Sequence, residues 1–126
     1  MSILVAKNVS KSFRMRGQEI RVLNDLNLEL MSGHSLAITG PSGSGKSTLI
    51  TILSAIEAPD QGELTIAGCR INDIDQTQRS KIRTENISIV FQEFNLIQSL
   101  TAIENVKIAA DIIGLENTKK RAEDAL

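Results

Sequence analysis

The first part of the chain has the hydrophobic pattern of β-strands. Residues 3–9 are strand-like, and from Ile20 to Leu30 apolar and polar side chains mostly alternate. A period of two places successive side chains on opposite faces of a strand, so that one face of a sheet is buried and the other is exposed. We therefore expect residues 1–34 to be mostly antiparallel β-structure.

The pattern changes after a turn at Ser32-Gly33. Residues 36–38 form a short apolar run, typical of a buried strand, which leads directly into a glycine-rich segment. From Ser47 onward apolar residues recur at helical spacing, and this pattern ends before Pro59, which cannot continue a helix. The order predicted here is strand, loop, helix.

Three further segments follow Pro59. Residues 62–68 are bracketed by glycines and suit a strand, whereas the polar residues 75–85 predict either a helix or a loop. Residues 87–91 are rich in β-branched and aromatic side chains, which favours a second buried strand. A crossover between parallel strands would connect the two buried strands.

The last part of the chain has helical signals. Thr101 and Glu104 stand at the spacing of a capping box, and the helix that they begin should end at Gly114. Another helix is expected to start near Asn117 or Thr118. It has run fewer than ten residues when the sequence stops at Leu126, as an interrupted helix would.

The glycine-rich segment carries the clearest chemistry. Gly40, Gly45, Lys46 and Ser47 match the P-loop pattern G-x-x-x-x-G-K-[ST]. Glycine lets the backbone turn its N–H groups toward phosphate oxygens, and the positive end of the next helix adds to the attraction. The Lys46 ammonium should reach the β- and γ-phosphates, and the Ser47 hydroxyl should bind Mg²⁺. The residues expected to bind the nucleotide are Gly40, Pro41, Ser42, Gly43, Ser44, Gly45, Lys46, Ser47 and Thr48.

Composition restricts the remaining possibilities. The 126 residues are enough for one domain, and 41% apolar and 23% charged residues with a net charge of -1 are typical of a soluble globular protein and give no indication of nucleic acid binding. No apolar run approaches the length of a membrane span, and the N-terminus lacks the pattern of a secretory signal, so we expect a cytoplasmic location. The single cysteine, Cys69, and the single histidine, His34, are given no role.

Together, these motifs resemble the nucleotide-binding domain of ABC transporters. Residues 90–96 are similar to the family's Q-loop, and residues 101–106 to the helix start that follows it. The similarity extends over the whole chain and is greatest to the branch that serves lipoprotein release and macrolide export. The other segments that carry it are 24–28, the loop 40–49 and 59–68.

The resemblance implies an α/β fold. It consists of a P-loop NTPase core with an antiparallel β subdomain, truncated before the Walker B strand. Residues 1–34 would be the antiparallel part, 35–91 a portion of the P-loop core, and 92–126 the Q-loop and the start of the helical subdomain. ATP and Mg²⁺ are the cofactors that the family uses.

Two residues outside the loop acquire roles through the resemblance. Gln92 stands where the family's Q-loop glutamine ligates Mg²⁺ or positions water, so it is the candidate catalytic and metal-binding residue. An amide carbonyl can do both without adding charge. Phe13 stands where family members place an aromatic ring that stacks on adenine, and the alternative is an ordinary core residue.

The implied function is the ATP-binding part of an ABC transporter, which couples ATP hydrolysis to transport when complete and dimeric. Its partners would be a transmembrane permease subunit, contacted through the Q-loop region, and a second nucleotide-binding domain, on the cytoplasmic face of the membrane. Since no Walker B, signature or histidine-switch residues occur before Leu126, this chain alone is not expected to hydrolyse ATP. The alternatives are a catalytically inactive nucleotide-binding fragment with no transport role, an ABC-type ATPase of ribosomes or DNA repair, and a P-loop kinase or GTPase-like switch.

Overall fold

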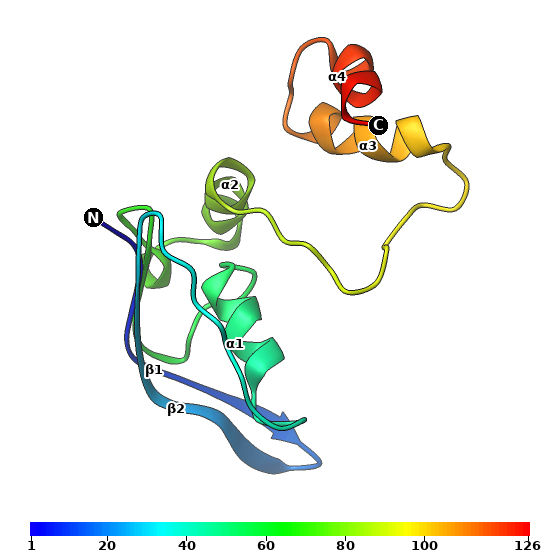
Figure 1. The fold of residues 1–126 in the computed structure, drawn as a ribbon. Helices are drawn as coiled ribbons and strands as arrows, with labels where there is room; N and C mark the ends of the chain where they lie inside the picture. The colour runs from blue at the N-terminus through cyan, green and yellow to red at the C-terminus, as the bar shows by residue number, and fades with distance from the viewer. The chain divides into compact units, whose positions relative to one another are not determined.

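The computed structural model describes all of residues 1–126, which form two compact units, Met1–Ser88 and Ile89–Leu126. Each unit has its own elements (Figure 1). Those of the first unit are β1 (Ser2–Met15), β2 (Gln18–Met31), α1 (Lys46–Leu53), β3 (Gln61–Ile66), β4 (Cys69–Arg70), the 3₁₀ turn η1 (Ile71–Asp73) and α2 (Gln76–Asn86). Those of the second unit are α3 (Ala102–Ile112) and α4 (Thr118–Ala125).

The strands form one antiparallel sheet in the order β2-β1-β3-β4. One side of the sheet is the long hairpin of β1 and β2, with β2 at the edge, which confirms the antiparallel structure predicted for the first residues. The hairpin register shifts where Lys11 pairs with Leu23 and Ser12 pairs with Arg21. Val22 is therefore an extra residue on β2, as in a β-bulge, which re-aims the side chain that it carries.

The core of the first unit lies between the sheet and α1. Leu49 and Ile52 of α1 pack into the same buried cluster as Val9 of β1 and Leu64 of β3. The helix thus follows the predicted spacing, with the glycine-rich loop at its N-terminus and its apolar face on the sheet. The other buried members of the cluster are Ala6, Leu23, Ala55, Ile66 and Ile71.

Helix α2 closes another side of this core. Its Ile82 packs against the buried cluster, and Arg83 donates a hydrogen bond from Nη1 to the carbonyl oxygen of Ala55 over 2.9 Å. The helix begins with a capping box, in which Asp75 accepts from the Gln78 N–H and the Gln78 side chain accepts from the Asp75 N–H. This resolves the choice between helix and loop left open for these residues.

The second unit is a helical hairpin. Thr101 caps α3 and forms the predicted capping box with Glu104, the helix ends before Gly114, and α4 starts at Thr118 as expected. Ala122 of α4 is buried. None of the four α-helices has the length and hydropathy that a membrane-spanning helix requires.

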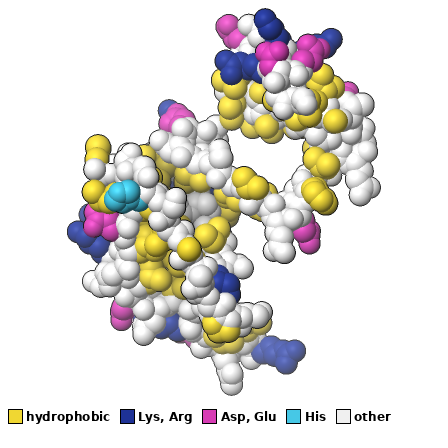
Figure 2. Space-filling model, viewed as in Figure 1, with side chains coloured by type: hydrophobic (Ala, Val, Ile, Leu, Met, Phe, Trp, Pro, Cys, Tyr) yellow, Lys and Arg dark blue, Asp and Glu magenta, His cyan; other side chains and the backbone are white.

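Two of the strands predicted from the sequence are not formed. Residues 36–38 and 87–91 are extended chain without ladder partners, and the crossover between parallel strands is therefore not formed. Val90 is 97% exposed rather than buried. A strand is stabilised by hydrogen bonds to a neighbouring strand, and neither run pairs with a strand of the sheet, although Ile38 and Ile87 pack against the core. Hydrophobic side chains consequently reach the surface (Figure 2).

Candidate functional site

The glycine-rich loop ends at the first turn of α1. Gly45 is the N-cap residue and adopts a φ of 88°, a left-handed conformation that suits glycine. A Cβ at this position would lie 3.0 Å from Cγ1 of Val22 and 3.1 Å from its carbonyl oxygen. The loop therefore packs directly on the β2 backbone at the bulge, and this close approach fixes where α1 begins.

The first turn of α1 has no side chain that caps it and no acidic residue. The first N–H groups of a helix have no intrahelical acceptors, and the helix dipole makes this end positive. The loop and the first turn together line a cavity of about 500 Å³. The residues around it are Val22, Ser42, Gly43, Gly45, Lys46, Ser47 and Thr48. Such a cavity attracts anions, phosphate groups above all.

Lys46 lies folded over the loop. Its Nζ donates hydrogen bonds to the carbonyl oxygens of Gly40 at 2.8 Å and Pro41 at 2.6 Å, and lies 3.5 Å from Oγ of Ser44. The side chain is half-buried, and the Ser47 hydroxyl beside it is exposed. The ammonium thus lies among the residues that line the cavity, where its full positive charge adds to the positive potential of the helix N-terminus.

Phe13 lies on β1, half-buried, opposite Ile20 of β2. It does not line the cavity at the loop, whereas Val22 of the same hairpin does. Val22 was missed by the sequence analysis because a bulge in one strand leaves no signal in an alternating pattern. The stacking role of Phe13 stays a prediction.

Gln92 belongs to the second unit, where its side chain is exposed. The segment that follows it is strongly exposed and apolar: Phe94 is 91% and Leu96 is 63% exposed. Gln92 and the loop residues belong to different units, and the metal-binding and catalytic roles of Gln92 stay predictions.

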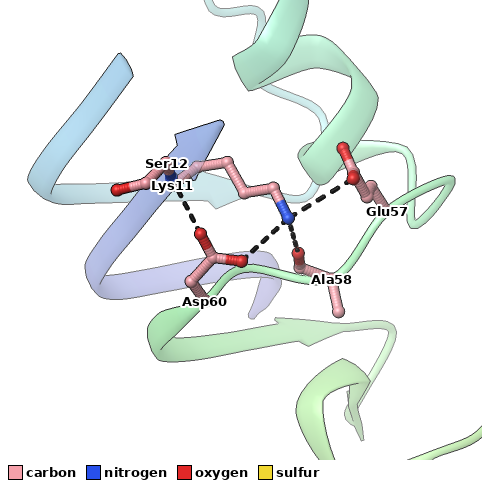
Figure 3. Close-up of polar contacts among 5 residues, drawn as sticks. All are labelled: Lys11, Ser12, Glu57, Ala58 and Asp60. Atoms are coloured by element: carbon pink, nitrogen blue, oxygen red, sulfur yellow. Dashed lines mark hydrogen bonds and ion pairs between the residues drawn. The ribbon is translucent and has the colours of Figure 1, made fainter. Parts of the chain in front are cut away.

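A polar cluster that the sequence analysis missed joins β1 to the segment after α1 (Figure 3). Lys11 is buried, and its Nζ lies 2.9 Å from Oδ1 of Asp60 and 3.3 Å from Oε1 of Glu57. It also donates a hydrogen bond to the carbonyl oxygen of Ala58 at 3.2 Å, and the Ser12 N–H donates to Oδ2 of Asp60 at 2.8 Å. All three protons of the ammonium therefore have acceptors.

The cluster changes the proton affinities of its members. Burial disfavours the charge on Lys11, but the hydrogen bonds to Asp60 and Glu57 outweigh burial and raise the pKa of the ammonium. Burial also works to raise the pKa of Asp60, but hydrogen bonds from Lys11 and the Ser12 N–H lower it. Both groups thus stay charged over the whole neutral range of pH.

The chain contains no cluster of three or more His, Cys, Asp or Glu side chains that could hold a metal ion by themselves. The predicted donors are instead the hydroxyl of Ser47 and the amide of Gln92. Neutral oxygen donors suit Mg²⁺, which commonly keeps several waters and takes most of its other ligands from phosphate oxygens. The residues present therefore fit a magnesium ion that arrives with a nucleotide.

Comparison with known proteins defines the class. The family model described as ABC transporter matches residues 23–126, and the chain belongs to this family. The antiparallel sheet and helices match the fold of a solved ATP-binding cassette, which confirms the fold class expected from the sequence. That structure is the dimeric post-hydrolysis state of the cassette MJ0796 bound to ADP and Pi, with a TM-score of 0.86 and 39% identity over 96% of this chain and 54% of that one.

Curated relatives agree with the predicted branch. An uncharacterized ABC transporter ATP-binding protein, MJ0796 of Methanocaldococcus jannaschii, is 44% identical over 102 residues, which are 81% of this chain and 43% of the relative. The macrolide export ATP-binding/permease protein MacB of Salmonella paratyphi A is 36% identical over 121 residues, 96% of this chain and 19% of the relative. The chain thus spans less than half the length of these curated relatives.

Proposed function

We propose that this chain is part of the ATP-binding subunit of an ABC transporter and binds Mg-ATP through residues 40–48. The observation that carries the proposal is the cavity of about 500 Å³ that is lined by Lys46 and by the uncapped first turn of α1. Each hydrogen bond to a charged group contributes about 1.5–3 kcal/mol, so several such bonds from the loop would dominate the affinity for a nucleotide. The relatives named as ATP-binding proteins support the choice of ATP.

The proposed roles divide among a few residues. The backbone of the loop and the Lys46 ammonium bind the β- and γ-phosphates, and the Ser47 hydroxyl holds Mg²⁺, which neutralises phosphate charge when it is bound. Gln92 supplies its amide carbonyl to the metal or to a water, and Phe13 stacks on adenine. Support for these last two roles comes from the positions of both residues in segments that resemble the family's motifs.

The wider function is the coupling of ATP hydrolysis to transport, with a second nucleotide-binding domain and a membrane permease as partners, on the cytoplasmic face. The dimeric structure of the cassette MJ0796 and the relative named as an ATP-binding/permease protein support these partners. In this proposal the antiparallel part is residues 1–34 and the portion of the P-loop core is residues 35–91. The Q-loop and the start of the helical subdomain are residues 92–126. The permease would contact the last of these segments, where Phe94 and Leu96 are exposed.

The test is Mg-ATP binding and phosphate release by the 126-residue chain. Lys46→Ala should weaken ATP binding at least about tenfold, the value of one hydrogen bond to a charged group. Ser47→Ala should make the binding less dependent on Mg²⁺, whereas Lys81→Ala, which changes an exposed lysine on α2, should leave it intact.

The two readouts separate the alternatives. Binding without phosphate release would favour a nucleotide-binding piece that needs further parts to turn over. Phosphate release that depends on Lys46 would show that residues 1–126 suffice for hydrolysis. ATP binding that is unchanged by Lys46→Ala would refute the proposed site.

A further inference from the structure

Lys11 is an unusual residue to find inside this unit. It is only 8% exposed and carries a charge, and a lysine is almost never buried unless it is paired. Its ammonium has three acceptors, on Glu57, Ala58 and Asp60, so the charge is fully hydrogen-bonded. An ion pair taken out of water is nonetheless weak evidence for stability, because the cost of desolvation can cancel the attraction. We therefore look for a role of the buried cluster other than stability.

The acceptors of Lys11 all belong to the segment that immediately follows α1. This helix has the phosphate-binding loop at its N-terminus. The pair of Lys11 and Asp60 thus ties β1 to the segment that follows the helix presenting the loop (Figure 3). Asp60 strengthens the connection with its second carboxylate oxygen, which accepts from the Ser12 N–H, and its own N–H donates to the Ser10 carbonyl oxygen.

The Lys11 ammonium also lies close to the ring of Phe13. Lys11 and Phe13 are two positions apart on β1 and therefore share a face of the strand. The Nζ of Lys11 lies 5.5 Å from the centroid of the ring, within the range of a cation–π interaction. A cation held at this distance stabilises one orientation of the half-buried ring.

We propose that Lys11 is a positioning residue for the nucleotide base: anchored by Asp60 and Glu57, it holds the Phe13 ring in the orientation that stacks on a purine. The inference rests on the proposed function and deepens it. Lys11 does not touch the nucleotide but acts through Phe13, and it fixes the ring relative to the helix that carries the phosphate loop.

The experiment compares two ligands of the same chain: Mg-ATP, and inorganic tripolyphosphate, which has the phosphates but no base. Lys11→Met should weaken ATP binding about two- to fivefold, the range expected for one cation–π contact, and leave tripolyphosphate binding unchanged. Lys46→Ala should weaken both ligands. Lys7→Met, at an exposed lysine of the same strand, is the matched control and should change neither.

A double-mutant cycle distinguishes positioning from a general loss of structure. In a Phe13→Ala background, Lys11→Met should have no further effect on ATP binding, because the ring through which Lys11 acts is gone. Lys11→Arg should restore part of the affinity. If Lys11→Met does not fold, Asp60→Asn keeps the lysine but removes its anchor and should give the same selective loss for ATP.

Two results would overturn the inference: an equal loss of ATP and tripolyphosphate binding in the folded Lys11 or Asp60 variants, or effects of Lys11→Met and Phe13→Ala that simply add. Failure of the proposed function has a different signature, since neither ligand would then depend on Lys46.

Discussion

Gly62 lies directly against the backbone of Asn8, where β3 passes β1. Gly62 adopts a φ of 87°, and a Cβ placed on it would fall far inside van der Waals contact of the Asn8 carbonyl group. The neighbouring atoms are backbone, so they cannot rotate away as a side chain would. Close pairing of the two central strands thus depends on the absence of a side chain at this position.

We expect Gly62→Ala to destabilise the first unit by at least about 2 kcal/mol, from the left-handed backbone and the overlap together. Urea unfolding of the chain would measure the change. Gly68→Ala is the matched control, because Gly68 has a φ of 79° with no atoms near its Cβ position. It should incur the backbone cost alone, about 1–2 kcal/mol. Equal effects of the two substitutions would contradict the proposed overlap.

The pair of Lys11 and Asp60 makes stability depend on pH in two directions. The pKa of Asp60 is lowered from its ordinary value of 3.8, so its contribution to the free energy of unfolding is present above that value and is lost as pH falls through the lowered pKa. The pKa of Lys11 is raised from 10.5, so its contribution is complete below that value and is lost as pH rises through the raised pKa. Stability should therefore be greatest between these limits.

Asp60→Asn tests this assignment by urea unfolding across the pH range. The variant should lose part of the acid slope and part of the alkaline slope, because Lys11 keeps Glu57 but no longer has the Asp60 carboxylate as a partner. Some acid slope should remain, since the pKa values of Glu104 and Asp111 are also lowered, mainly by hydrogen bonds from Thr101 and Thr118 respectively. A profile parallel to that of the unchanged chain would show that the pair does not titrate with folding.

Local signals in the sequence were sufficient to predict several helices and where they begin. The capping box of Thr101 and Glu104 satisfies N–H groups within one turn, so it depends on no other part of the chain, and α3 begins where it predicts. The helix predicted from Ser47 onward after the P-loop pattern begins one residue earlier, at Lys46. Asp75 and Gln78 form the same kind of box, and attention to their spacing would have identified α2 from the sequence.

Structural features that depend on residues far apart in the sequence could not be predicted from such local signals. Residues 36–38 and 87–91 have the composition of buried strands, but a strand exists only with a neighbour, and neither has one here. The ion pair of Lys11 and Asp60 joins residues that no sequence period relates. The bulge at Val22 depends on how two strands pair, so the cavity residue from β2 was not predictable.

The two capping boxes can be tested by substitution of their N-cap residues, and each variant serves as the control for the other. Thr101→Ala should destabilise α3 by about 1 kcal/mol, which is about a fivefold loss of protection from amide hydrogen exchange. Asp75→Ala should do the same to α2. Since the helices belong to different compact units, each substitution should leave the other helix unchanged. Loss of protection in both helices from either substitution would contradict independent units.

The contact between Gly45 and Val22 gives the last prediction. A side chain at Gly45 would press on Cγ1 and the carbonyl oxygen of Val22, and the loop would have to move away from β2 to relieve it. Gly45→Ala should therefore weaken tripolyphosphate binding at least about tenfold, as expected when one hydrogen bond to a charged ligand is lost, in addition to a backbone cost of about 1–2 kcal/mol in stability.

Gly17→Ala separates the two effects, because Gly17 has a φ of 81°, open space around it and a position outside the loop. It should show the stability loss without the binding loss. If Gly45→Ala bound tripolyphosphate as well as Gly17→Ala did, the packing of the loop on β2 would not be what places the N–H groups of α1 around the phosphates. The shape of the site would then depend on the loop alone.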